Sequence, residues 1–327
     1  MRILVTGGAG FIGSEFVRGL LTRRTDRVTV LDALTYAGNL ANLAPVANLP
    51  AFDFIQADIR DAETVEQVMP GHDAVVHFAA ESHVDRSIAG ATPFVTTNVL
   101  GTQVLLDAAR RHGVGRFVHV STDEVYGSID SGAWSEDQPL DPSSPYSASK
   151  AGSDLLALAC HRTHRMDVVV TRCSNNYGPY QYREKLIPLF VTRLLTGEQV
   201  PLYGDGGNVR EWLHVADHCR GIELALDRGR PGEIYHIGGG TELTNRELVG
   251  RLLAACGRDW SAVRHVEDRK GHDRRYALSV EKIRNELGYA PQVSFDEGLA
   301  ATVAWYRDNP DWWRPRGGTP EKAVVGA

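Results

Sequence analysis

The sequence predicts an α/β fold in which a doubly wound parallel sheet is followed by a smaller mixed α/β domain. Strand and helix patterns alternate through the first half of the 327-residue chain, and a glycine-rich turn follows the first strand directly. After about residue 175 the alternation loosens into segments punctuated by proline and glycine. Such alternation favours right-handed β-α-β units around a buried parallel sheet.

Short apolar runs predict the strands, at 2–6, 27–31, 52–57, 73–78, 115–121 and 167–173. Helical patterns predict helices from the glycine turn to about 22 and at 61–69, 93–112, 145–164, 184–196, 213–227, 244–255 and 295–309. We expect a first domain over 1–175 to which some later segments return, a second over 176–309, and a partly disordered tail over 310–327.

Composition narrows the class of protein. The formal charge is −6 with no long run of Lys or Arg, which argues against a nucleic-acid partner. The cysteines form none of the short pairs typical of zinc or redox motifs: Cys160, Cys173, Cys219 and Cys256. The first strand pattern begins at Arg2, and no apolar run approaches the roughly 18 residues that span a bilayer. We therefore expect no signal peptide, no membrane partner and a cytoplasmic protein.

A glycine turn predicts a dinucleotide cofactor. Gly7, Gly10 and Gly13 lie in TGGAGFIG between a strand and a helix, where small residues let backbone N–H groups approach a pyrophosphate. Asp32 ends the next strand, where a carboxylate can bind the adenosine ribose and favours NAD over NADP. The alternative is a tight turn with Asp32 capping a loop. Residues that end two later strands could also approach the cofactor: Asp58, Ile59, Phe78, Ala79 and Ala80.

Two further patterns suggest chemistry. Tyr146 and Lys150 are four residues apart on one face of a predicted helix, where a neighbouring ammonium can lower a phenol pKa and create a base for an alcohol. Asp123 and Glu124 follow the 115–121 strand, at the edge where open α/β sheets bind ligands. Two acids there could donate and accept protons at neighbouring carbons. Solvated helix and turn residues are the alternative for both pairs.

Together these residues carry a family resemblance, over residues 2 to about 309. The matching segments are TGGAGFIGS, HFAAESHVDRS, STDEVYGS, PYSASKAGSD, RCSNNYGPYQ, PLYGDGGNVREWLHVADHCRG and DRKGHDRRY. The chain resembles extended short-chain dehydrogenases/reductases with a Rossmann-type fold, and among them the dTDP-glucose 4,6-dehydratases. Thr122-Asp123-Glu124 is the most specific segment, because the related 4-epimerases resemble other patterns at that place.

The resemblance implies a redox-neutral dehydration of dTDP-glucose with NAD as cofactor. Tyr146 would remove the proton of the 4-hydroxyl, with Lys150 stabilising the phenolate and binding the cofactor ribose. Glu124 would then take the C5 proton while a protonated Asp123 protonates the departing 6-hydroxyl. This requires a raised pKa for Asp123, and hence surroundings poor in positive charge. Thr122 would form a hydrogen bond to the 4-oxygen of the sugar. The alternative is a strand-end residue whose hydroxyl bonds only to the backbone.

The resemblance also implies two binding sets. The cofactor set extends to Phe11, Ile12, Leu34, Thr35, Ser82, Thr97, Tyr146, Lys150 and Asn176. The nucleotide-sugar set comprises Ser82, Thr122, Asn175, Lys185, Leu186, Pro201, Tyr203, Arg210, Asn245, Arg269 and His272. Two of these have alternatives: Arg210 could pair with Glu211 or another acid, and Asn245 could merely occupy a first helical turn behind a Thr244/Glu247 capping box.

Other functions stay open on the residues alone. A sugar-nucleotide 4-epimerase or a decarboxylase would keep the cofactor turn and the Tyr146/Lys150 pair without needing Asp123 as an acid. A silent dinucleotide-binding module would need the glycines only. The histidines match no metal pattern, so we expect no metal. The helices at 93–112 and 145–164 have apolar residues on several faces, and the resemblance implies a homodimer built on them.

Overall fold

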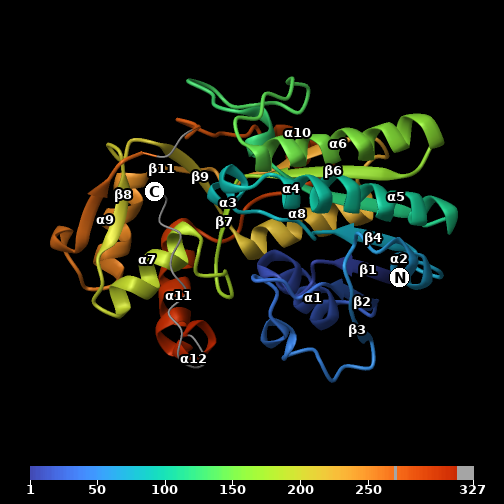
Figure 1. The fold of residues 1–327 in the computed structure, drawn as a ribbon, viewed down its shortest axis with the longest axis horizontal. Helices are drawn as coiled ribbons and strands as arrows, with labels where there is room; N and C mark the ends of the chain where they lie inside the picture. The colour runs from blue at the N-terminus through green and yellow to red at the C-terminus, as the bar shows by residue number, and fades with distance from the viewer. Residues whose placement is uncertain (269–270, 315–327) are drawn as a thin grey trace.

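The fold is organised around a seven-stranded parallel sheet (Figure 1). The structure is a computed structural model that describes residues 1–268 and 271–314. The strand order is β10-β6-β5-β4-β1-β2-β3, and every neighbouring pair is parallel. The strands are β1 (Arg2–Thr6), β2 (Arg27–Asp32), β3 (Phe52–Gln56), β4 (Ala74–His77), β5 (Arg116–Thr122), β6 (Val168–Cys173) and β10 (Ile234–Ile237).

Helices cover both faces of this sheet, as a doubly wound fold requires. One apolar core joins one face to α1 (Phe11–Arg23), α8 (Val215–Arg228) and α10 (Glu281–Leu287). A second core joins the other face to α2 (Ala62–Val68), α5 (Thr102–Arg111) and α6 (Pro145–His164). The inner strands are mostly apolar because they are buried from both sides, whereas the edge strand β3 is partly exposed.

A smaller unit with its own core lies beside the large sheet (Figure 1). It contains the sheet β11-β9-β7 and the strand pair β12-β8. Its elements are β7 (Asn175–Tyr177), α7 (Leu186–Leu195), β8 (Val200–Tyr203), β9 (Val209–His214), β11 (Thr241–Thr244), α9 (Asn245–Ala255), η4 (Trp260–Ala262), β12 (Val263–Val266), α11 (Phe295–Asp308) and α12 (Pro310–Trp313).

The predicted strands and helices agree with the structure to within two residues at nearly every end. The helix expected at 93–112 differs in its interior. It begins as α4 (Thr92–Phe94), passes through a π-helical stretch, η2 (Val95–Gly101), and continues as α5. The remaining elements, η1 (Leu40–Leu43), α3 (Val84–Ala89) and η3 (Asp123–Tyr126), are single turns or little more.

Segments after residue 175 relate to the domain boundaries that the sequence analysis expected. The chain returns to the large sheet with β10, which pairs with β6, and with α8, which packs on β5 and β6. The expected tail begins as α12, whereas 315–327 lie outside the described residues. Across the described part of the chain, helices are too short or too polar to cross a membrane.

Candidate active site

The glycine turn between β1 and α1 comes into close contact with the end of β4. Gly7 has φ +71°, and a Cβ there would lie 2.5 Å from the backbone nitrogen of Ala79. At Gly13 a Cβ would lie 2.3 Å from the Gly7 carbonyl oxygen. Only glycine fits both positions, since one needs a left-handed backbone and both lack space for a side chain. The turn therefore leaves room beside the N-terminus of α1, where backbone N–H groups favour an anion.

Asp32, at the end of β2, holds this turn. Its carboxylate accepts hydrogen bonds from Ala9 N (2.9 Å) and Leu34 N (2.8 Å). Burial raises the pKa of Asp32, while the two backbone N–H groups oppose that rise. Asp32 thus faces the turn, as a ribose-binding carboxylate of this fold would.

A cavity of about 400 Å³, here called the inner cavity, opens at this sheet edge. Every residue of the predicted cofactor set lines it except Leu34, which is held through its backbone bond to Asp32. Five buried polar atoms among its lining residues have no hydrogen-bond partner within the described chain: Ser121 Oγ, Asp123 Oδ2, Ser174 Oγ, Asn175 Oδ1 and Gln181 Oε1. The glycine cradle and these unsatisfied atoms fit a bound dinucleotide, because buried polar groups need partners.

The Thr122-Asp123-Glu124 segment lies where β5 ends and η3 begins. Thr122 caps that turn: its hydroxyl accepts a bond from Glu124 N (3.3 Å) and donates one to Asp123 Oδ1 (3.1 Å). The side chain of Asp123 is 2% exposed. Thr122 therefore bonds backbone, as its alternative interpretation held, and also bonds the acid beside it.

Asp123 has the environment that an acid catalyst needs. Its pKa is raised well above the ordinary value by burial first and then by the charges of Glu124 and Glu211. The Thr122 hydrogen bond and Arg210 oppose this shift. The expectation of a raised pKa for Asp123 is confirmed, and Glu211 is a contributor that the sequence did not reveal.

Tyr146 and Lys150 are both buried on α6. Burial, Glu124, Cys173 and Asp123 raise the pKa of Tyr146, and a hydrogen bond to Thr122 opposes this. The sequence had led us to expect that a neighbouring ammonium, reinforced by an oxidised nicotinamide, lowers this pKa. The Lys150 ammonium instead donates to the Val120 carbonyl (2.8 Å), so its charge is partly engaged by backbone. Burial and the adjacent acids therefore have the largest influence on the pKa of the Tyr146 phenol.

Lys150 keeps a basic pKa despite its burial. Burial lowers its pKa to about 8, and Asp154, one helical turn further along α6, opposes that shift. Asp154 is itself bonded to Arg172 (2.9 Å) on β6 and lies 3.2 Å from His119 on β5. This buried set ties α6 to the sheet and fixes the helix face that carries Tyr146 and Lys150.

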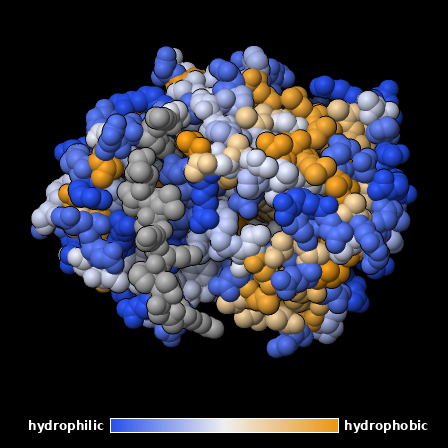
Figure 2. Space-filling model, in the orientation of Figure 1, coloured by the Kyte–Doolittle hydropathy of each residue, from blue (hydrophilic) through white to orange (hydrophobic). Residues whose placement is uncertain are grey.

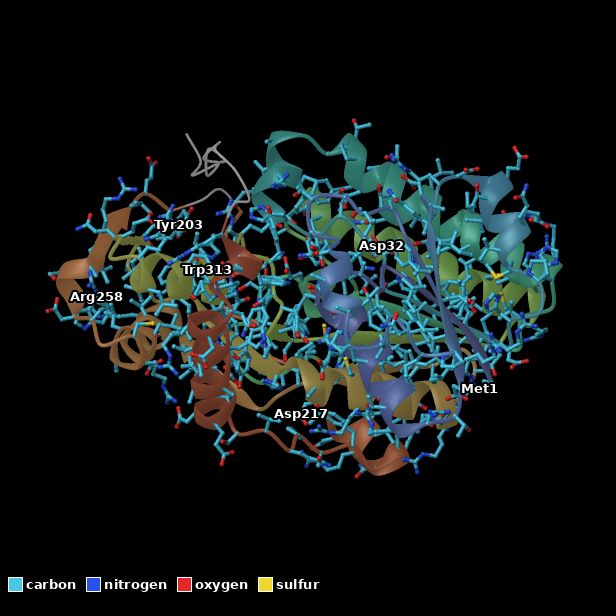
Figure 3. All side chains as sticks on the ribbon, turned by 90° about the horizontal axis from the view of Figure 1, so that it is seen from below. Met1, Asp32, Tyr203, Asp217, Arg258 and Trp313 are labelled. Carbon is cyan, nitrogen blue, oxygen red and sulfur yellow. The ribbon has the colours of Figure 1, made fainter. Side chains whose placement is uncertain are left out.

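A second cavity of about 670 Å³, the outer cavity, lies between α7, β8 and β9. It contains Asn175, Lys185, Leu186, Pro201, Tyr203, Arg210, Asn245 and His272 of the predicted nucleotide-sugar set. Ser82 and Thr122 line the inner cavity instead, and Arg269 lies outside the described residues. The two cavities share Glu124, Asn175, Tyr182, Glu184 and Lys185, so they meet at the acidic segment. Figure 3 shows Asp32 and Tyr203 on opposite sides of this region.

Arg210 is fixed for use in the outer cavity. Its guanidinium donates to the Val209 and Asp273 carbonyls (2.7 and 2.9 Å) and stacks over Tyr276 at 4.3 Å. Arg210 and Glu211 are successive residues of β9, so their side chains point to opposite faces of the strand. Glu211 accepts hydrogen bonds from the backbone N–H groups of Gly240 and Leu278.

Asn245 fits both of its interpretations. It stands in the first turn of α9 behind the Thr244/Glu247 capping box, and it also lines the outer cavity.

A cluster at the junction of the cavities was missed. The Arg86 guanidinium donates to Glu184 (3.2 Å) and stacks over the Tyr36 ring at 4.0 Å. Next to Glu184, Lys185 donates to the Ser82 carbonyl (2.5 Å). These residues come from three separate segments of the sequence, so no spacing could reveal the cluster. The segment HFAAESHVDRS was noted only for its family likeness. Within the described residues, no group of His, Cys, Asp or Glu could hold a metal.

Comparison with known proteins fits this geometry. A family model described as GDP-mannose 4,6 dehydratase matches residues 4–302. A dTDP-glucose 4,6-dehydratase of Streptomyces niveus is 64% identical over 320 residues, covering 96% of this chain and 95% of that protein. The chain belongs to the dTDP-glucose 4,6-dehydratase family.

Solved structures of dTDP-glucose 4,6-dehydratases share the whole fold. The Streptomyces venezuelae enzyme with NAD and TYD bound has a TM-score of 0.95 and 67% identity, covering 96% of this chain and 99% of that one. The Bacillus anthracis enzyme in complex with NAD has a TM-score of 0.90 and 48% identity, covering 96% and 98%. The predicted family and the Rossmann-type fold are therefore confirmed.

Proposed function

We propose that this protein uses NAD to convert dTDP-glucose to dTDP-4-keto-6-deoxy-glucose, acting as a hydro-lyase. The observation that carries the proposal is the buried Asp123, whose pKa is raised by burial and by the charge of Glu124 beside it, where the two cavities meet. When bound, NAD supplies the hydride acceptor for C4 and the hydride donor for C6 within one turnover. The family relatives named above are dTDP-glucose 4,6-dehydratases, which supports this substrate.

The chain's own residues move the protons. Tyr146 takes the proton of the 4-hydroxyl, and the Lys150 ammonium stabilises the phenolate that forms. The resulting 4-ketone acidifies C5, from which Glu124 removes a proton, and C5 is protonated again when the hydride returns to C6. Asp123 gives its proton to the 6-hydroxyl, which departs as water. Asp123, Tyr146 and Lys150 are buried and Glu124 is partly buried, which limits access of solvent and strengthens these electrostatic interactions.

The nucleotide part of the substrate would lie in the outer cavity. Arg210 presents its guanidinium to the diphosphate, and its stacking on Tyr276 fixes the plane of that group. The inner cavity would hold the cofactor with its pyrophosphate at the glycine turn. Glu124, Asn175 and Lys185 then lie where the sugar meets the nicotinamide.

The reaction can be tested directly. With dTDP-glucose, we expect a product that develops the alkaline absorbance of a 4-keto sugar, with no net consumption of NAD. A 4-epimerase would instead give dTDP-galactose without that absorbance. A protein that retains NAD but turns over no nucleotide hexose would contradict the proposal and favour a silent binding module.

We also propose a homodimer formed by α6 and the helix through η2 and α5. Large apolar side chains there are about half exposed, at Val95 (51%), Leu100 (52%) and Leu155 (55%). Figure 2 shows hydrophobic residues gathered over these helices. The helices pack against one another, so their apolar side chains form one surface.

A single charge should test this surface. We expect the protein to sediment as a dimer at micromolar concentration, and Leu155→Asp to shift it toward monomer because a carboxylate would be buried unpaired. Leu40→Asp is the matched control, since Leu40 is 49% exposed but lies in η1, between β2 and β3. A wild-type monomer, or equal effects of both substitutions, would contradict the proposal.

The four free cysteines support a reducing, cytoplasmic setting. Microscopy of the tagged full-length protein in its host would detect any other location.

A further inference from the structure

The C-terminal helix α12 makes a connection that the proposed chemistry does not use. The Trp312 indole N–H donates to Asn42 Oδ1 (2.9 Å), 270 residues earlier in the chain. Asn42 lies in η1 and is 1% exposed. The contact therefore joins the smaller unit to the cofactor half of the molecule.

From Asn42 the connection continues into the glycine turn. The Asn42 amide donates to the Ala9 carbonyl (2.9 Å), which also accepts from Asn39 N (3.0 Å). On its other side, Ala9 donates through its N–H to Asp32. A carbonyl oxygen has two lone pairs, so both are used here. Ala9, the residue that precedes Gly10 and α1, is thus held through both its N–H and its carbonyl.

Aromatic packing holds Trp312 in place. Its ring meets Trp305 at 5.0 Å and Tyr180 at 5.9 Å between centroids. Tyr180 has φ +67°, a strained conformation for a bulky residue, and stacks under the Arg18 guanidinium of α1 at 4.3 Å. Arg18 in turn donates to the Asn42 carbonyl (2.5 Å). The aromatic cluster of Trp312, Trp305 and Tyr180 is therefore connected to Asn42 in two ways: directly through Trp312, and through Tyr180 and Arg18 of α1.

We propose that Trp312 and Asn42 are positioning residues for the cofactor: through Ala9 they fix the glycine turn and slow the release of NAD. This rests on the proposed use of NAD. Neither residue lines the inner cavity, so their effect must pass through the turn. A turn that must open to release a pyrophosphate opens more often when one of its fixing hydrogen bonds is removed.

The test compares Trp312→Phe with Trp305→Phe in the full-length holoenzyme, using exchange of bound NAD for isotope-labelled NAD. Phe keeps an aromatic ring at 312 but removes the N–H donor, and we expect exchange to become about three- to tenfold faster, the effect of one hydrogen bond. Trp305→Phe is the control: it alters the same aromatic cluster, yet within the described chain no hydrogen bond ties Trp305 to the turn. Unchanged exchange in Trp312→Phe, or equal acceleration in both variants, would overturn the proposal.

Two further measurements separate this inference from its premise. In an Asn42→Ala background, Trp312→Phe should add nothing, whereas a full additional effect would show that Trp312 acts by another route. Hydrogen–deuterium exchange of the peptide containing residues 7–13 should increase in Trp312→Phe, and unchanged protection there would count against the connection. That readout needs no cofactor chemistry. A wild-type protein that retains no NAD would instead contradict the proposed function.

Discussion

Replacing Tyr146 with Phe is expected to lower kcat for dTDP-glucose by about 10²- to 10⁴-fold, the range for loss of a positioned acid–base group. The substitution removes one oxygen and keeps the ring, which packs against Phe94 at 6.3 Å between centroids. KM and the bound NAD content should change little. Steady-state kinetics with quantified NAD measures both.

Tyr235→Phe is the matched control for this prediction. Tyr235 is fully buried in β10 and donates to Glu286, so its substitution also removes a buried hydroxyl, but far from both cavities. We expect its activity to stay near that of the wild type. A loss below tenfold in Tyr146→Phe would exclude Tyr146 as the base that starts the reaction.

Asp123→Asn is expected to separate the chemical steps. An amide of the same shape cannot give up a proton to the 6-hydroxyl, so dehydration should slow by about 10²- to 10⁴-fold. Oxidation at C4 depends on Tyr146 and should change far less. Single-turnover measurements would follow the reduced nicotinamide as it accumulates and the 4-keto-6-deoxy product as it forms. Equal loss of both steps would reject the assignment of Asp123 as the acid.

Asp123→Asn is also expected to change how the stability of the folded protein depends on pH. Because the pKa of Asp123 is raised in the folded state, the folded protein binds more protons than the unfolded chain above pH of about 4. The free energy of unfolding therefore falls as pH rises toward the folded-state pKa. Asp123→Asn should remove this loss and raise Tm at pH 8 more than at pH 5. Asp26→Asn is a contrasting control, since it breaks an ion pair with Arg24 and should lower Tm.

The site was predictable where it follows from sheet topology. β1, β4, β5 and β6 are parallel neighbours, so the residues that end them meet at one edge. Gly7, Ala79 and Asp123 could therefore be placed near one another from the order of strands and helices alone. Thr122-Asp123-Glu124 then added the chemistry, through its position and its likeness to a family.

Other parts depend on contacts that no local pattern encodes. The π-helical η2 was expected to be a regular helix. It differs because the Asn98 side chain bonds both the N–H and the carbonyl of Glu81 (2.9 Å each), and Gly101 packs closely on Ile59. Such an interruption is set by tertiary partners. The Arg86–Glu184 contact likewise joins residues 98 positions apart.

The late return of the chain to β10 constrains how the protein is made. During synthesis β6, with its run Val168-Val169-Val170, remains an unpaired sheet edge until the ribosome has added the residues up to Ile237, on the order of several seconds later. An apolar edge exposed for that time is a template for association between nascent chains. The cofactor half is thus complete only after much of the smaller unit has been synthesised, so a gene divided near codon 175 would encode an open-edged fragment in place of an independent domain.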